Sequence, residues 1–346
     1  MIIDARCYTS GRIALVNLST SMDGLERCSI EHPTFDSLSA LSKLLFVRGD
    51  LLGRIADHDR AQLVAKKAIL WSRDMGSALY IRARLAERFH RFEEANALLD
   101  QALAAGHPTQ EIDLEKASVF QATGKYKEAL VLRESLAKEN RGIHTLGSLA
   151  TLLAEMDEWA AAETCYAAAL DADEGASPIP PGQLLFEWGV SAMRRGDLDR
   201  AAAIFIELEA ILPQHVPGRG HRAEVALARG QLDLAAALIT PLLEISDDPE
   251  YRATYAEILA ARGDDSEAAS QAEHAAAEYE LLLARRPTAY YDHAAEFFMS
   301  VGNRPQRAAE LARANWQLRD TPRSRSLMAK ALRNAQQGFL VKECAA

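Results

Sequence analysis

The sequence predicts an all-α protein, an α-solenoid built from about eight helical hairpins. Two observations carry this prediction. Apolar residues recur three and four positions apart through residues 185–213, on both sides of Arg195-Gly196-Asp197, which indicates two amphipathic helices joined by a tight turn. The same pattern then recurs at a nearly constant interval along most of the 346-residue chain. Because stacked hairpins bury their apolar faces against each other, one continuous core can run the length of such a chain.

The turn and the helix ends of this hairpin show how each unit is delimited. Gly196 tolerates the left-handed backbone that ends a helix, and Asp197 can cap the next helix. Pro213 ends the second helix because it has no amide hydrogen to donate. Gly189 and Ala201 are small residues placed where the two helix backbones must approach closely. The combination resembles the tetratricopeptide repeat (TPR), and this resemblance implies a right-handed superhelix.

An alanine at the start of the second helix marks each unit. Aligning it identifies Ala61, Ala95, Ala129, Ala162, Ala201, Ala235, Ala268 and Ala308. Five of the seven gaps between these alanines lie within one residue of 34, the period of the TPR. A short turn precedes most of them: His90-Arg91-Phe92, Gly124-Lys125-Tyr126, Asp157-Glu158-Trp159, Gly196-Asp197-Leu198, Gly230-Gln231-Leu232 and Gly263-Asp264-Asp265. We therefore expect about eight TPR-like hairpins over residues 34–322.

Residues 1–33 do not follow the repeat and form an N-terminal arm or cap. Two interpretations remain open for them. Ile2–Tyr8 and Arg12–Leu18 can pair as short strands across Thr9-Ser10-Gly11, because glycine tolerates the positive φ of such turns. Alternatively, the segment is an irregular arm that lies on the first hairpin. Either arrangement would cover the apolar end of the solenoid.

The first hairpin begins after Thr34 and is expected to be degenerate, because Gly49-Asp50 comes too early for the period. Residues 49–57 are therefore expected to form an extended turn. Farther along, residues 173–182 cause the gap of 39 residues and contain three prolines within four positions. Prolines at this density predict an extended surface loop, with a hinge or a docking strand as alternatives.

The last part of the solenoid departs from the period in a different way. Glu267 to Arg286 contains no glycine or proline, which predicts a long helix that ends at Pro287. A final helix from Arg323 to about Gln337 has no partner, so residues 323–346 are expected to be a C-terminal capping helix and tail.

Composition excludes several classes of function. The formal net charge is −10 and the pI is about 5.5, which disfavours a nucleic-acid partner. No run reaches the roughly 18 apolar residues of a membrane span. The four cysteines include no CxxC and indicate free thiols, with a Cys7–Cys28 disulfide as the alternative. Since the N-terminus lacks the pattern of a secretion signal, we expect a cytoplasmic protein.

No pattern for catalysis or for a cofactor is present. The sequence has no GxSxG or reactive-cysteine signature, and Gly218-Arg219-Gly220 follows no strand, so it is interpreted as a turn between repeats. His293 and Glu296 stand three apart on one helix and could share a metal ion, but two ligands do not make a site. We therefore predict no catalytic residues, no metal and no cofactor.

The TPR resemblance supplies a candidate binding surface, because the first helix of each hairpin lines the concave face in that family. The residues placed in this groove are Tyr80, Arg84, Arg88, Glu115, Gln121, Thr151, Glu187, Arg194, His221, Glu224, Glu257 and His293. Arginines dominate its early part and glutamates its later part, so a ligand of opposite polarity would bind in one orientation. The lysine and asparagine clamp with which some TPR domains hold chaperone tails is absent.

The sequence thus predicts a non-enzymatic adaptor or scaffold that binds a protein or peptide of unknown identity in the groove. Two alternatives remain: a metal-dependent sensor or enzyme centred on the last repeat, and a self-associating structural protein. Homo-oligomerisation is left open. Ser246 to Tyr251 and Arg286 to Phe298 also resemble segments of uncharacterised bacterial TPR proteins, which suggests a bacterial origin and supplies no activity.

Overall fold

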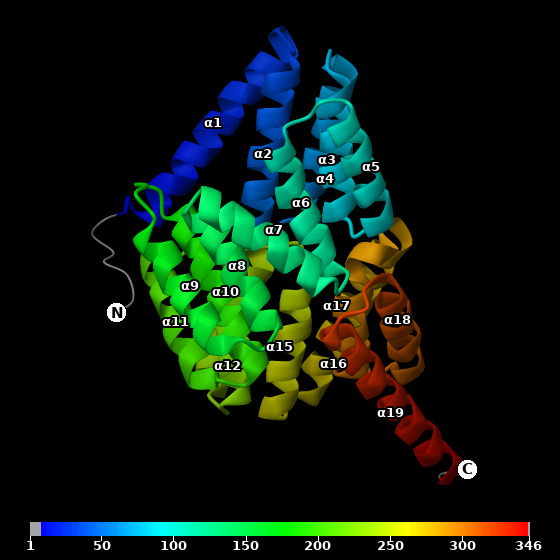
Figure 1. The fold of residues 1–346 in the computed structure, drawn as a ribbon. Helices are drawn as coiled ribbons and strands as arrows, with labels where there is room; N and C mark the ends of the chain where they lie inside the picture. The colour runs from blue at the N-terminus through cyan, green and yellow to red at the C-terminus, as the bar shows by residue number, and fades with distance from the viewer. Residues whose placement is uncertain (1–7, 345–346) are drawn as a thin grey trace.

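The computed structural model describes the backbone of residues 8–344 and the side chains of residues 8–337. Within these residues the chain is helical, with no strand (Figure 1). In order the helices are α1 (Gly11–Glu31), α2 (Phe35–Leu52), α3 (Ile55–Trp71), α4 (Met75–Arg88), α5 (Phe92–Ala104), α6 (Thr109–Ala122), α7 (Tyr126–Glu139), α8 (Ile143–Glu155), α9 (Trp159–Asp171), α10 (Ile179–Arg195), α11 (Leu198–Ile211), α12 (Val216–Ala228), α13 (Leu232–Ile239), α14 (Leu242–Ile245), α15 (Pro249–Arg262), α16 (Asp265–Arg285), α17 (Pro287–Met299), α18 (Pro305–Leu318) and α19 (Pro322–Cys344).

Neighbouring helices pair as hairpins and confirm the predicted α-solenoid. The pairs are α2 with α3, α4 with α5, α6 with α7, α8 with α9, α10 with α11, α12 with α13, α15 with α16, and α17 with α18. The largest cluster of buried apolar side chains draws on α1–α3 and α7–α15. Separate clusters lie within α4–α6 and within α15–α19, so the hairpins bury their apolar faces against their neighbours in several adjoining clusters.

The turn of every hairpin holds one residue with positive φ. These residues are Gly53, His90, Gly124, Asp157, Gly196, Gly230, Gly263 and Asn303. The left-handed conformation ends the first helix and reverses the chain so that the second helix packs back on it. The aligned alanines follow within the second helices and are 0–7% exposed. The repeat predicted from alanine spacing is thus the repeat of the fold.

The N-terminal arm is helical over Gly11–Glu31, so both the strand over Arg12–Leu18 and the alternative of an irregular arm are wrong for these residues. The segment lies in α1, where Ser10 accepts a hydrogen bond from the amide of Ile13. Ala14, Leu18 and Met22 are buried at four-residue spacing, which is the period of a helix and not of a strand. The other proposed strand, Ile2–Tyr8, lies almost wholly outside the described residues. Cys28 is a free thiol.

Two predicted breaks in helix are also corrected. Gly49-Asp50 lies inside α2, and the turn comes at Gly53, so the expected extended turn over residues 49–57 is wrong. Gly49 is small because the ring of His58 packs against it. Pro180 and Pro181, expected in an extended loop, lie in the first turn of α10. Proline is tolerated there because the first amides of a helix have no acceptor within it.

The superhelix brings the first hairpins against the last ones (Figure 1). The carboxylate of Asp247 accepts hydrogen bonds from the amides of Ile55 (2.6 Å) and Ala56 (3.0 Å) at the start of α3. Thr288, at the start of α17, donates to the carbonyl of Phe89 after α4 over 2.7 Å. These contacts join residues about 190–200 positions apart in the chain. None of the described helices combines the length and the apolar character that crossing a bilayer requires.

Candidate functional site

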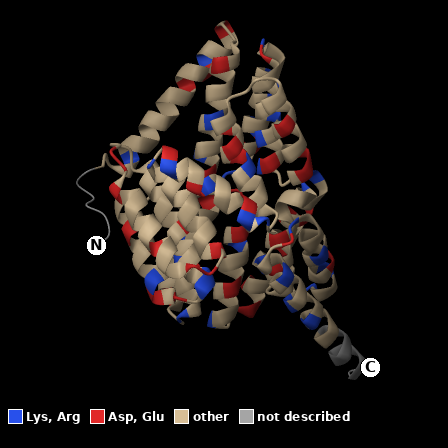
Figure 2. Cartoon of the chain, viewed as in Figure 1, with Lys and Arg blue, Asp and Glu red and all other residues tan. Residues whose placement is uncertain are grey.

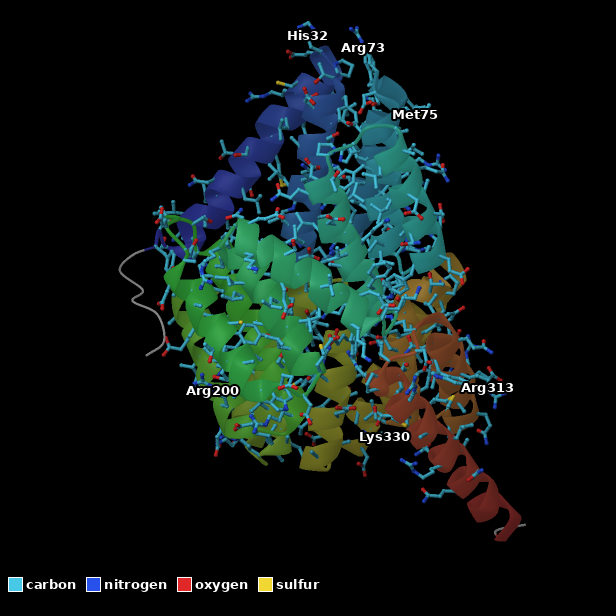
Figure 3. The ribbon with its side chains drawn as sticks, in the orientation of Figure 1. His32, Arg73, Met75, Arg200, Arg313 and Lys330 are labelled. Atoms are coloured by element: carbon cyan, nitrogen blue, oxygen red, sulfur yellow. The ribbon has the colours of Figure 1, made fainter. Side chains whose placement is uncertain are left out.

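The inner face of the solenoid encloses a cavity of about 980 Å³. We call it the interior cavity. The polar and charged residues of its lining used below are Gln121 of α6, Arg133 of α7, Thr151 and Glu155 of α8, Glu187, Ser191 and Arg194 of α10, Glu296 of α17, Arg319, and Arg323 and Lys330 of α19. Most of these side chains lie on first helices of hairpins, while α19 closes the cavity from the C-terminal end. Lys330 is labelled on this helix in Figure 3.

Positive charge exceeds negative charge on this lining. Its cations are Arg133, Arg194, Arg319, Arg323 and Lys330, and its carboxylates are Glu155, Glu187 and Glu296. Two of the arginines are already paired within the protein. Arg323 contacts Glu296 at 3.3 Å and Arg319 contacts Asp292 at 3.6 Å.

Arg133 and Arg194 make no ion pair within the described part of the chain. Arg133 is 7% exposed, and its Nε has no hydrogen-bond partner. Burial lowers the pKa of Arg133, because the charged form loses its hydration. Arg194 lines the cavity with an exposed side chain, while the surrounding protein and the charge of Arg323 lower its pKa to about 10. The cavity thus presents two guanidinium groups without an ion pair of their own, on which the carboxylates of the lining act only from a longer distance.

A hydrogen-bonded wall faces these cations. Glu187 accepts hydrogen bonds from Thr151 and Gln183, each over 3.1 Å. The buried hydroxyl of Tyr166 lies 3.1 Å from both Thr151 and Ser191. Burial raises the pKa of Glu187. Because these groups bond one another, the wall is held in position before any ligand arrives.

The structure divides the predicted groove residues among several places. Gln121, Thr151, Glu187 and Arg194 line the interior cavity, while Arg88 and His293 line a smaller cavity of about 330 Å³. The remaining residues lie elsewhere on the first helices: Tyr80, Arg84, Glu115, His221, Glu224 and Glu257.

The basic early part of the predicted groove is neutralised inside the protein. Arg84 contacts Glu115 at 2.9 Å, and the hydroxyl of Tyr80 donates to the same carboxylate over 3.2 Å. Arg88 forms an ion pair with Asp50. These arginines are therefore less available to a ligand than their sequence positions suggest.

The glutamates and histidines of the later repeats also have partners. His221 lies 2.8 Å from Glu224 on α12, and burial raises the pKa of Glu257 on α15. His293 faces Glu250 at 3.7 Å, while Glu296 pairs with Arg323. The metal pair considered from sequence, His293 with Glu296, is thus divided between two different partners.

Several cavity residues were missed by the sequence analysis. Arg133 lies on a second helix, which the family pattern does not place in the groove. Arg323 and Lys330 come from residues 323–346, which were expected to act only as a cap, and Arg319 lies just before them at the end of the expected solenoid. The run of basic residues in 319–330 was a signal, but its spatial neighbours could not be known without the superhelix. Figure 2 shows basic and acidic positions interspersed on the viewed side, with no continuous basic surface.

Comparison with known proteins agrees with the fold. Residues 192–258 match the family model of the tetratricopeptide repeat. No curated protein matches the sequence. Among solved structures, the Cut9–Hcn1 hetero-tetramer of the APC/C gives a TM-score of 0.51 at 15% identity, over 90% of this chain and 58% of that chain. The protein therefore spans little more than half of that relative, and the likeness shows the fold alone.

Two other solved structures resemble the chain less closely. A tetratricopeptide repeat protein from Parabacteroides merdae gives a TM-score of 0.47 at 19% identity, over 70% of this chain and 93% of that chain. A human IFIT1 dimer with PPP-AAAA gives 0.43 at 15% identity, over 86% and 71%.

Proposed function

Since the chain is a tetratricopeptide repeat solenoid, we propose that it is a non-enzymatic scaffold that binds a segment of a partner protein in the interior cavity. The cavity volume of about 980 Å³ lies at the upper end of the range for small-ligand pockets, and it suits a short extended segment better than a folded domain. Helices supply most of its lining, so the binding groups stand on rigid elements.

Arg133 and Arg194 carry this proposal, because neither forms an ion pair with a carboxylate among the described residues. Arg133 is buried, and a buried cation without a contacting anion costs free energy that a ligand carboxylate would recover. The side chain of Arg194 is exposed on the cavity lining and is open to a ligand. Arginine also binds carboxylates through two parallel hydrogen bonds, which orients the ligand. We therefore propose that the bound segment is acidic and that its carboxylates contact these two guanidinium groups.

The hydrogen-bonded wall gives such a segment a second side to contact. Gln121 is a buried side chain on the cavity lining whose Oε1 has no hydrogen-bond partner, so it can accept from a backbone amide of the ligand. An extended peptide could direct its acidic side chains toward the arginines and its backbone amides toward Gln121 of α6. Because both contacts must form together, they would favour one register of the peptide.

Fluorescence anisotropy with labelled acidic, neutral and basic octapeptides tests the proposal. We expect the acidic set to bind and Arg194→Gln to weaken binding by about tenfold or more, since a charged hydrogen bond contributes roughly 1.5–3 kcal/mol. Arg84→Gln is the matched control, because Arg84 is on an inner helix but is already paired with Glu115. Equal binding of the acidic and basic sets, or equal losses in the two variants, would reject the interior cavity as the site.

A further inference from the structure

We propose that His221, Glu224 and Glu250 form a binding site for a divalent transition-metal ion, with His293 in reach as a fourth ligand. One ligand atom from each of the first three residues lies within 4.8 Å of the other two. Nδ1 of His293 is 3.7 Å from Oε2 of Glu250. This inference concerns residues outside the interior cavity and does not depend on the proposed partner segment.

Stacked repeats explain why these residues meet. His221 and Glu224 are one turn apart on α12, so both side chains lie on the same face of that helix. Glu250 stands in the first turn of α15 and His293 in the middle of α17. These three helices are the first helices of consecutive hairpins, which the superhelix places side by side on its inner face. Residues about 30–70 positions apart thus converge on one point.

The spacing of the donor atoms suits a small ion after a modest adjustment. Around a tetrahedral ion with bonds of about 2.0–2.1 Å, neighbouring ligand atoms lie about 3.3 Å apart. His221 Nδ1 and Glu224 Oε2 are 2.8 Å apart, which is shorter than this separation, and His293 Nδ1 and Glu250 Oε2 are 3.7 Å apart, which is longer. All four side chains are partly exposed, so they have room to rotate toward a shared ion.

The surroundings hold the ligands in place. The ring of His221 stacks on Phe186 with ring centroids 5.5 Å apart, which restricts the imidazole on one side. Packing of this kind limits the orientations open to a metal ligand, as the groups around most protein metal sites do.

The ion pairs of the cluster also favour a cation at this point. Within the described residues, Glu224 and Glu250 have only imidazoles as ion-pair partners, His221 and His293 respectively. A divalent ion would compensate the two carboxylates, while neutral histidines would supply nitrogen donors.

The donor set indicates the class of metal. Two imidazole nitrogens and two carboxylate oxygens suit Zn²⁺, or Mn²⁺, Fe²⁺ and Co²⁺ in a more open geometry. Ca²⁺ and Mg²⁺ prefer oxygen ligands throughout, so they are expected to bind weakly. Because the ligands come from three hairpins, a bound ion would tie those hairpins together and stabilise the fold.

Isothermal titration calorimetry of tag-free, chelator-treated protein with Zn²⁺ tests the site, with the thermal midpoint as a second readout. We expect one Zn²⁺ per chain, a raised thermal midpoint, and a far weaker response to Ca²⁺. His221→Gln and Glu250→Gln should each weaken Zn²⁺ binding by more than about tenfold. His274→Gln is the control, because His274 is an exposed histidine on the outer helix α16.

Three outcomes would overturn the proposal. They are absence of saturable Zn²⁺ binding, binding that survives both ligand substitutions, and equal binding of Ca²⁺. Circular dichroism of each variant confirms that it is folded, and Glu250→Gln keeps the size of a side chain that is already partly exposed.

Discussion

The buried side chain of His215 caps the start of α12 and packs against Phe186 of α10. His215 is 3% exposed, and its Nδ1 accepts a hydrogen bond from the amide of Gly218 over 3.0 Å, which caps α12. Its ring contacts Phe186 with centroids 5.0 Å apart. Burial lowers the pKa of His215 to about 4, with the nearby charges of Asp50 and His221 acting in opposite directions.

This pKa shift predicts a stability that depends on pH. Between pH 6.5 and pH 4 the unfolded chain binds a proton at His215 that the folded protein excludes, so stability falls as the pH falls through that window. His215→Asn keeps an acceptor for the Gly218 amide but removes the titration. Urea denaturation should show the wild-type protein losing about 2 kcal/mol more than the variant between pH 7 and pH 5. A difference between the two proteins that is the same at both pH values would contradict this account.

At the scale of helices, small residues set how closely the two members of a hairpin pack. Gly189 of α10 was predicted from sequence to permit close approach, and a methyl group there would lie 2.5 Å from the ring of Phe205 on α11. Glycine also recurs in the turns, where the backbone needs a positive φ. Glycine occupies most of the positive-φ positions, whereas His90, Asp157 and Asn303 adopt that conformation at a steric cost.

A pair of glycine substitutions separates packing from helix propensity. Gly189→Ala should lower the free energy of unfolding by about 1–3 kcal/mol, because Phe205 must move. Gly24→Ala in α1 should raise it by about 1 kcal/mol, since no atom lies within 4 Å of the added methyl and alanine favours helix. Thermal or urea unfolding of both variants measures the difference. If the two substitutions shift stability in the same direction, close helix approach is not the reason for Gly189.

At the scale of the whole molecule, contacts between the first and last hairpins convert an open solenoid into one that surrounds a cavity. Arg54, the N-cap residue of α3, makes no side-chain capping bond, and Asp247 from the α14–α15 connection supplies that bond instead. Arg286 near the start of α17 also pairs with Asp59 of α3 at 2.5 Å. The stability of the α3 start therefore depends on contacts from residues about 190–230 positions later in the chain.

Removal of the long-range cap tests this closure. Asp247→Ala should cost about 1 kcal/mol of stability, the usual value for a lost helix cap, and should increase amide exchange at Ile55 and Ala56. Asp264→Ala is the matched control, because Asp264 precedes α16 as an exposed N-cap residue without a side-chain capping bond. Hydrogen exchange measured by mass spectrometry gives the local readout. Unchanged exchange at the start of α3 would show that Asp247 does not hold the hairpins together.

The sequence alone determined the helical class, the hairpin unit and its register, because these depend on residues close together in the chain. Alanine spacing located the second helices, and the turn residues located most helix ends. The same local evidence failed at Gly49-Asp50 and at Pro180-Pro181, where a glycine required by packing and prolines in a first helical turn imitate a break. It also left a strand or an irregular arm as the two interpretations of a segment that is part of α1, whose burial pattern depends on neighbours that come later in the chain.

Only the tertiary structure decided which inner-face residues meet. Gln121, Thr151, Glu187 and Arg194 were predicted to line the groove and do lie together, and the basic residues of α19 join them from the end of the superhelix. Stacking of consecutive hairpins paired Arg88 with Asp50 and brought Glu250 beside His221. The physical reason is that a small rotation between successive hairpins, summed over eight of them, sets which distant helices touch. No local pattern of residues encodes that sum.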